Sequence, residues 1–158
     1  WHTEPAHNRH RGPRRLPRGL LLVMRQDRES QRIPMQRRAL ITGLEGAALT
    51  GAEARFLRQT RPLGIILFAR NCESHAQIRT LVADALSAIG TPETLVLIDQ
   101  EGGRVQRLRP PLGRALPPAE AYAQRYEQGD CDGACAAVEG ASRLVARDLR
   151  DLGINTNC

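Results

Sequence analysis

The sequence predicts an α/β fold, the amino-terminal half of a TIM-like (β/α)8 barrel in which parallel strands alternate with helices. Three continuous apolar segments, at residues 39–44, 64–69 and 94–98, have the length and composition of buried strands. The segments between them carry apolar residues at helical spacing. A fourth strand begins near the end of the chain, so four strand starts with helices between them are present, half the number of strands in a barrel of about 250 residues. Because the strands are apolar throughout, we expect both faces of the sheet, or the core of a barrel, to be buried.

The first β/α unit joins the strand at 39–44 to a short helix. Thr50 and Glu53 have the spacing of a capping box, in which each side chain accepts a hydrogen bond from the other residue's backbone N–H. This spacing predicts a helix that begins after Thr50 and continues through Arg58.

The second unit joins the strand at 64–69 to a longer helix. Ser74 and Gln77 have the spacing of another capping box, and Gly90 is suited to end the helix. One face of this helix is apolar and consists of Ile78, Leu81, Val82, Ala85, Leu86 and Ile89.

The third strand, at 94–98, leads directly into a polar motif at 99–107. An acid, an amide, a second acid, two glycines and two arginines arrive together there. The carboxyl end of a parallel strand is where ligands bind in α/β proteins. Two helices are then expected, at about 119–128 and 133–152, before residues 154–158 start the fourth strand. One side of the second helix carries Ala134, Val138, Ala141, Val145, Leu149 and Leu152.

A doubly wound open sheet is the alternative fold. The turn Gly43-Leu44-Glu45-Gly46 lacks the G-x-G-x-x-G pattern, and no other phosphate-binding loop occurs in the sequence. The barrel is therefore the preferred interpretation.

The positive charge of the chain is concentrated in its amino-terminal part. Residues 1–38 hold ten Arg and three acidic residues, whereas the remainder holds thirteen Arg and fourteen acidic residues. We therefore expect no nucleic-acid binding by the folded part. Residues 1–34 lack apolar periodicity and are predicted to be a disordered basic tail. We expect the natural product to begin at Met35 and residues 35–158 to form the partial barrel domain.

Cysteine and histidine patterns predict neither a metal site nor a cofactor. The four cysteines have no partner His or Cys at zinc spacing, and we expect them to be reduced; they are Cys72, Cys131, Cys135 and Cys158. Cys135 falls on the apolar side of the helix predicted at 133–152. We expect no specific metal binding by the histidines of the tail, His2, His7 and His10.

The chain contains one brief apolar run outside the predicted strands and helices, at residues 19–24. It is too short for a signal-peptide core or a membrane span. The sequence therefore predicts a soluble, cytoplasmic protein.

Asp99 is the residue of the motif that we expect to bind a ligand. As the first polar residue after a buried strand, its carboxylate is placed to accept hydrogen bonds from sugar hydroxyls, and Arg107 can donate to the same ligand. Glu101 and Arg104 are expected to form an internal ion pair that shapes the loop. Because Gly102 and the glycine after it break the strand, Asp99 and Glu101 are not assigned as a catalytic pair.

Other candidate residues are expected to have structural roles. Arg70 and Asn71 follow the second strand and are predicted to form a loop. His75 is expected in the first turn of a helix, exposed to solvent and without a role as general base. No Ser-His-Asp set can be assembled from the remaining residues.

Three segments resemble successive blocks of bacterial β-N-acetylglucosaminidases of glycoside hydrolase family 3. They read Gly-Ile-Ile-Leu-Phe-Ala-Arg-Asn at 64–71, Leu-Ile-Asp-Gln-Glu-Gly-Gly-Arg-Val-Gln-Arg-Leu at 97–108, and Leu-Gly-Ile-Asn-Thr-Asn-Cys at 152–158. Their order and spacing agree with the family. The resemblance covers about residues 39–158, and the second block is the specific one.

The resemblance implies a barrel and a cytoplasmic enzyme of peptidoglycan recycling. Such enzymes remove terminal N-acetylglucosamine from muropeptides, with retention and through a covalent glycosyl-enzyme intermediate. In the family, the Asp that opens the motif and the Arg that closes it hold the sugar, and these positions are Asp99 and Arg107 here. No metal or cofactor is implied.

The family's Lys-His pair, its acid/base His and its nucleophilic Asp lie beyond the fourth strand. We therefore expect no catalytic group in this chain and no activity of the chain alone. The open edges of a half barrel predict self-association. The alternatives are a fragment of a family-3 β-glucosidase and a non-catalytic sugar-binding remnant.

Overall fold

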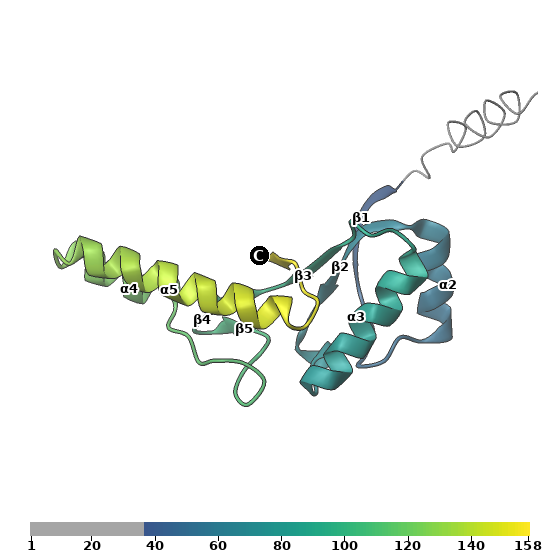
Figure 1. Cartoon of the computed structure of the whole chain (residues 1–158), viewed down its shortest axis with the longest axis horizontal. Helices are drawn as coiled ribbons and strands as arrows, with labels where there is room; N and C mark the ends of the chain where they lie inside the picture. Colours follow the sequence, from purple (N-terminus) through teal and green to yellow (C-terminus); the bar gives the residue numbers. More distant parts are fainter. Residues whose placement is uncertain (1–36) are drawn as a thin grey trace, which may run out of the picture. The chain divides into compact units, whose positions relative to one another are not determined.

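The strands of the computed structural model, which describes residues 37–158, form one four-stranded parallel sheet and one two-stranded antiparallel sheet. The larger sheet has the order β1-β2-β3-β6 (Figure 1). An order that follows the sequence is that of a barrel, whereas a doubly wound sheet reverses its order at a switch point. The predicted α/β fold is confirmed. The strands are β1 (Arg38–Gly43), β2 (Pro62–Leu67), β3 (Leu95–Ile98) and β6 (Thr156–Asn157).

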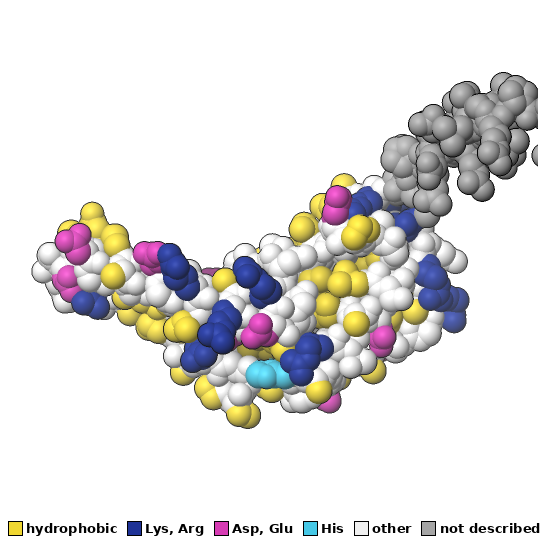
Figure 2. All heavy atoms as spheres, viewed as in Figure 1, with side chains coloured by type: hydrophobic (Ala, Val, Ile, Leu, Met, Phe, Trp, Pro, Cys, Tyr) yellow, Lys and Arg dark blue, Asp and Glu magenta, His cyan; other side chains and the backbone are white. Residues whose placement is uncertain are grey.

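The expectations for residues 1–34, including the tail histidines, and for a start at Met35 lie outside the described residues. Basic and acidic side chains both occur on the described part of the face shown in Figure 2, with apolar side chains among them.

Helix α2 (Gly51–Thr60) begins with the predicted capping box. The side chain of Thr50 accepts from the backbone N–H of Glu53, and the Glu53 carboxylate accepts from that of Thr50 at 2.9 Å. Burial acts to raise the pKa of Glu53, but hydrogen bonds from the backbone of Glu45 and from Thr50 outweigh it and lower that pKa.

Helix α3 (His75–Ile89) has the predicted cap and end, but its capping box is incomplete. Ser74 Oγ accepts from the backbone N–H of Gln77 at 3.2 Å. The Gln77 side chain accepts from the backbone N–H of Glu73 instead of that of Ser74, at 3.0 Å. Its amide group donates to the carbonyl oxygen of Asn71 at 3.1 Å, so this side chain joins the helix to the short 3-10 turn η1 (Ala69–Asn71). Gly90, at φ 70°, ends α3 as expected.

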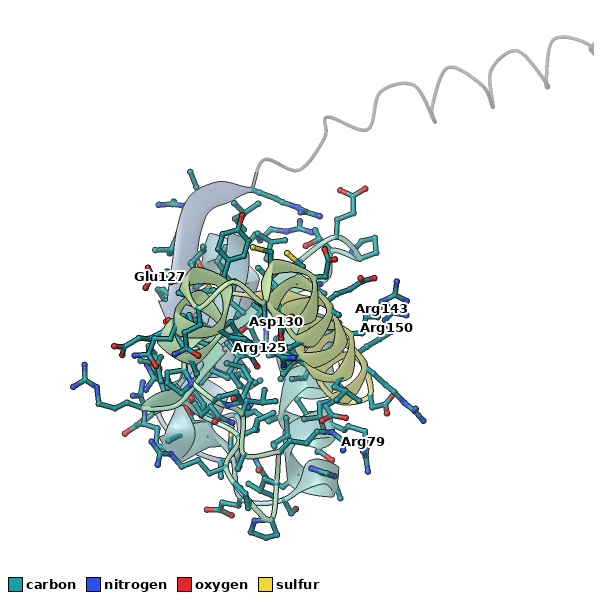
Figure 3. The ribbon with its side chains drawn as sticks, turned by 90° about the vertical axis from the view of Figure 1, so that its left-hand side faces the viewer. Arg79, Arg125, Glu127, Asp130, Arg143 and Arg150 are labelled. Atoms are coloured by element: carbon teal, nitrogen blue, oxygen red, sulfur yellow. The ribbon has the colours of Figure 1, made fainter. Side chains whose placement is uncertain are left out.

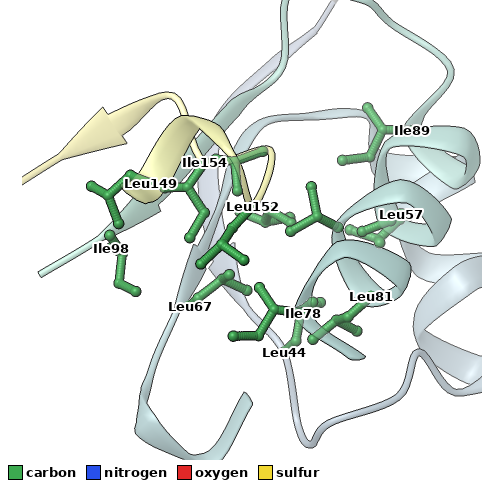
Figure 4. Close-up of a cluster of buried hydrophobic side chains, with 14 of the residues drawn as sticks. Leu44, Leu57, Leu67, Ile78, Leu81, Ile89, Ile98, Leu149, Leu152 and Ile154 are labelled. Atoms are coloured by element: carbon green, nitrogen blue, oxygen red, sulfur yellow. The ribbon is translucent and has the colours of Figure 1, made fainter. Parts of the chain in front are cut away.

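Helices α2 and α3 cover one face of the sheet (Figure 1). Alternate residues of β2 and β3 pack against these two helices. Residues from the end of the last helix and from the segment after it join the same core (Figure 4). The core of the described residues includes Leu57, Ile65, Leu67, Ile78, Leu81, Val96, Ile98, Leu149, Leu152 and Ile154.

The other face of the sheet is not covered to the same extent. In-register pairing puts Ile41, Gly64 and Leu95 on this face, and Ile41 is 43% exposed. Ile66 and Leu95 are half-buried. The expectation that every strand is buried on both faces is therefore wrong, above all for β1, because no helix of the described residues lies over this face. An uncovered apolar face agrees with the expectation for half of a barrel.

The polar motif forms a small hairpin, and two helices follow it. Strands β4 (Gln100–Gly102) and β5 (Val105–Gln106) are antiparallel. Helices α4 (Ala119–Glu127) and α5 (Cys131–Arg150) lie side by side, and Arg125 and Asp130 form an ion pair of 2.6 Å where they join (Figure 3).

The apolar stripe of α5 is buried at its two ends rather than along its whole length. Ala134 and Leu149 are buried, whereas Val138 is 44% exposed. Cys135, which was expected on a buried side, is exposed. The reason is that the middle of α5 extends beyond the sheet that its last turn packs on.

The four cysteines are unpaired, as predicted. Burial raises the pKa of the Cys72 thiol to about 11. None of the helices between residues 37 and 158 has the length and hydropathy that a membrane span requires.

Candidate functional site

Polar groups gather where β2 and β3 end. Leu67 and Ile98 are paired at the ends of these strands, so the next residues, Phe68 and Asp99, are neighbours across the sheet. Successive side chains of a strand point to opposite faces of the sheet, and this alternation puts Phe68 and Asp99 on the same uncovered face as Ile66. The site therefore lies at the carboxyl end of the sheet, on the side that corresponds to the inside of a barrel.

Asp99 and Arg107 form an ion pair at this position. The Arg107 Nη2 atom lies 2.5 Å from the Asp99 Oδ2 atom, and the two side chains are 30% and 21% exposed. Among residues 37–158, the Asp99 Oδ1 atom and the Arg107 Nη1 atom have no hydrogen-bond partner. The pair therefore keeps one acceptor and one donor group for a ligand. Neighbouring hydroxyls of a sugar, each both donor and acceptor, match this arrangement.

Gln100 brings Arg107 back to Asp99. Its buried side-chain oxygen accepts from the backbone N–H of Arg107 at 3.1 Å and from that of Leu108 at 3.0 Å. Its amide group donates to the Leu108 carbonyl oxygen at 2.9 Å. Three hydrogen bonds from one side chain thus hold the two charged residues of the ion pair together.

Gln106 does the same for the loop after the hairpin. It accepts from the backbone N–H of Leu116 at 3.2 Å and donates to the Arg114 carbonyl oxygen at 2.6 Å. The roles of Gln100 and Gln106 were not predicted from the sequence. The available signal was an amide at both ends of a hairpin that otherwise carries charges and glycines.

The two glycines of the motif are required by the turn. Gly102 has φ 104° and Gly103 has φ 56°. A Cβ atom at Gly102 would overlap the carbonyl oxygen of Pro117, and one at Gly103 would lie 2.7 Å from the Cβ atom of Pro118. The segment at Pro117 and Pro118 thus passes closely over the hairpin, and a side chain at either glycine would prevent this approach.

Two asparagines join the last strand to the site. Asn157 Oδ1 accepts from the backbone N–H of Gln100 at 2.8 Å, and its amide donates to the Gln100 carbonyl oxygen at 3.1 Å. Asn155 forms the equivalent pair of bonds with the backbone of Val96 and Thr94, at 2.8 and 3.0 Å. These side chains extend the ladder where β6 is short, a role that sequence reasoning also missed.

The other candidate residues lie apart from the ion pair or have structural roles. The expected ion pair between Glu101 and Arg104 is wrong: within the described range, Glu101 is exposed and joined to no cation. The reason is the turn at the two glycines, which ends the extended geometry between them. Asn71 is buried and bonded to the carbonyl oxygens of Leu44 and Gly46 at 3.1 and 2.8 Å, which confirms its loop role.

His75 lies in the first turn of α3 and is exposed, as predicted. Its Nε2 atom is 2.6 Å from the carbonyl oxygen of Leu112. No group of three potential metal-ligating side chains occurs between residues 37 and 158.

A hollow of about 630 Å³ lies next to the site, between β6, α4 and α5. Its lining includes Gln100 and Glu101 from the hairpin and apolar residues such as Val145 and Leu149 from α5. It does not include Asp99 or Arg107, so the ion pair and this hollow are distinct features.

Residues 38–158 match the family model described as the glycosyl hydrolase family 3 N-terminal domain. The chain is 42% identical over 112 residues to a beta-hexosaminidase of Thioalkalivibrio sulfidiphilus, covering 71% of this chain and 31% of that protein. It is 35% identical over 116 residues to a beta-hexosaminidase of Xanthomonas axonopodis, covering 73% of this chain and 34% of that protein. The chain thus spans about a third of the length of these curated relatives.

Solved structures of proteins with similar names also resemble this chain. NagZ from Neisseria gonorrhoeae, in complex with N-trifluoroacetyl-D-glucosamine, is similar with a TM-score of 0.69 and 32% identity, over 75% of this chain and 35% of that one. A family 3 beta-N-acetylglucosaminidase from Paenibacillus is similar with a TM-score of 0.63 and 28% identity, over 75% and 22% of the two chains.

Proposed function

Since the chain belongs to glycoside hydrolase family 3, as an N-terminal domain, we propose that it supplies part of the sugar site of a retaining β-N-acetylhexosaminidase. Asp99 and Arg107 are the residues proposed to hold a terminal N-acetylglucosamine unit. The observation that carries the proposal is the partly exposed ion pair at the carboxyl end of β3, with Oδ1 and Nη1 left for hydroxyl groups. Names of relatives and a neighbour solved with an N-acylglucosamine support this choice of sugar.

The physical task of the pair is to fix the sugar ring. A ring held by a carboxylate and a guanidinium loses its rotational freedom before the reaction, which is where much of the rate enhancement of enzymes arises. A retaining glycosidase also needs a nucleophile and an acid/base group at the scissile bond, and the resemblance implies that the family's Asp and His for these roles lie beyond the fourth strand. Because Asp99 is committed to Arg107, we propose that residues 35–158 bind the sugar and that this chain alone does not turn it over.

The finer parts of the proposal concern substrate and compartment. We propose that the natural ligand is an N-acetylglucosaminyl muropeptide and that the protein is a cytoplasmic enzyme of cell-wall recycling, as the resemblance implies. Residues 35–158 are proposed to be the domain responsible. A variant without residues 1–34 should bind the sugar as the full chain does.

The test is an NMR titration of the full chain with N-acetylglucosamine and, separately, with glucose. N-acetylglucosamine is expected to shift the backbone N–H signals of residues 99–107 in a saturable way, and glucose to do so more weakly. Incubation with a chromogenic N-acetylglucosaminide should release no chromophore. Equal or stronger effects of glucose would favour the β-glucosidase alternative. No shift with either sugar would remove the proposed site, and chromophore release would remove the claim of binding without turnover.

We also propose that the chain associates with itself through the open edges of its sheet and the apolar residues exposed there. Ile41 is 43% and Leu40 is 37% exposed on the edge strand β1, and unpaired strand edges promote pairing with other chains. Sedimentation velocity is expected to show concentration-dependent oligomers that are weakened by Ile41→Arg. Phe56→Arg, which changes an equally exposed apolar residue on α2, is the control and should leave association unchanged. A monomer at all concentrations would contradict this proposal.

A further inference from the structure

Two guanidinium groups lie over the ring of Phe68, the residue after β2. The Cζ atom of Arg70 is 4.7 Å from the ring centroid, and that of Arg107 is 5.9 Å from it. Both distances are within the range of a cation–π interaction, about 6 Å. The ring thus contacts Arg107, one member of the ion pair, although Phe68 follows β2 and Asp99 follows β3.

Phe68 has two further neighbours, Asn71 and Gly43. The backbone N–H of Phe68 donates to Asn71 Oδ1 at 2.8 Å, and Asn71 is buried. A Cβ atom at Gly43 would lie 3.1 Å from the Phe68 Cε2 atom, so the ring packs directly against the backbone end of β1. The backbone of Phe68 is therefore held by Asn71, and its ring lies close to the end of β1 as well as to Arg107.

Arg107 has little else to hold its guanidinium group. Asp99 is its one ion-pair partner among residues 37–158, and its Nε atom is buried without a hydrogen-bond partner. A sugar hydroxyl that donates to the Oδ1 atom of Asp99 takes up part of the negative charge of the carboxylate, which weakens its attraction for Arg107 at Oδ2. Hydroxyl groups bind the face of an aromatic ring much more weakly than they bind a carboxylate. The contact between the Phe68 ring and Arg107 therefore persists when the sugar binds.

We propose that Phe68 is a positioning residue, which keeps the guanidinium group of Arg107 in place while Asp99 binds the sugar. The inference rests on the proposed function of Asp99 and Arg107. Phe68 itself need not touch the sugar, since it acts through Arg107.

The test compares Phe68→Leu and Phe68→Tyr in the full chain. The chain offers a matched control, because its one other phenylalanine, Phe56, is exposed on α2 and can be changed to Leu in the same way. The first readout, without ligand, is the Arg107 side-chain Nε–H signal in the NMR spectrum, identified by its absence in Arg107→Gln. The second is the dissociation constant of N-acetylglucosamine.

Phe68→Leu is expected to move the Arg107 signal, because the ring current is lost, and to broaden it. The same change should weaken sugar binding about two- to fivefold, the range of a cation–π contact at an exposed site. Phe68→Tyr, which keeps the ring, should restore both, and Phe56→Leu should change neither. An Arg107 signal and an affinity that are unchanged in Phe68→Leu would overturn the inference. If the wild-type chain binds no sugar, the proposed function fails, while the Arg107 signal still decides whether Phe68 holds this side chain.

Discussion

Asp99→Asn is expected to weaken N-acetylglucosamine binding by about tenfold to a hundredfold. Asparagine has the shape of the carboxylate but no charge, and it replaces one of the two acceptor oxygens by a donor group. Hydrogen bonds to a charged group contribute about 1.5–3 kcal/mol, which corresponds to this loss of affinity. The change also removes the partner of Arg107, so its guanidinium group is held less well for the same ligand.

The measurement is a calorimetric or NMR titration of both proteins with the sugar. Asp84→Asn, which changes an exposed carboxylate on α3, is the matched control and should bind as the wild type does. Because Asp99 and Arg107 are partly exposed, the variant should remain folded, which circular dichroism can check. Equal affinities of Asp99→Asn and the wild type would rule out Asp99 as a sugar-binding residue.

Gly102→Ala is expected to have the largest effect on stability among the changes considered, at least about 2 kcal/mol, because it combines two penalties. The φ of 104° is unfavourable for any residue with a Cβ atom. The added methyl group would also overlap the Pro117 carbonyl oxygen. The backbone must then move away, which breaks the 2.8 Å hydrogen bond from the Gly103 N–H to the Leu116 carbonyl oxygen.

Gly129→Ala separates the two penalties. Gly129 has φ 96°, close to that of Gly102, but a Cβ atom there would meet nothing within 4 Å. Urea unfolding should therefore show a smaller loss of about 1 kcal/mol for Gly129→Ala, from backbone strain alone. Gly102→Ala should lose more and should also lose sugar binding, since the hairpin that returns Arg107 to Asp99 is displaced. Equal losses in the two variants would show that the close approach of Pro117 has no energetic importance.

The ion pair explains how a polar site remains stable without its ligand. In the structure, Asp99 and Arg107 satisfy each other at 2.5 Å, while Gln100 holds the backbone between them. Under the proposed function, a sugar enters a site that is already arranged, and few side chains have to be ordered on binding. The proposed role of Phe68 then predicts that the affinity depends on this ring, which holds Arg107 while Asp99 binds the sugar.

The helices could be predicted, with ends that differ by up to about two residues from those of the structure, because the relevant contacts are local. The capping box of Thr50 and Glu53 spans three residues, and the buried face of α3 repeats every three or four residues. Gly90 ends its helix through a backbone conformation that its own chemistry allows. These signals do not depend on the rest of the molecule.

Asp99 and Arg107 were also predicted from the sequence, but their arrangement was not. The apolar segment before Asp99 indicates the end of a buried strand, and the resemblance adds Arg107. The predicted ion pair between Glu101 and Arg104 was wrong, because the turn at Gly102 decides where their side chains lie.

The sequence by itself determined the elements, their alternation and the end of the strand at which the candidate residues Asp99 and Arg107 lie. Only the tertiary structure decided which amides hold the site together, that the guanidinium group of Arg107 lies over the ring of Phe68, and which face of the sheet stays uncovered. The physical reason is distance along the chain: the bond from the Gln100 N–H to Asn157 joins residues 57 positions apart. Such contacts, and the burial of a side chain, exist only after the strands have been brought together, so no short stretch of sequence contains them.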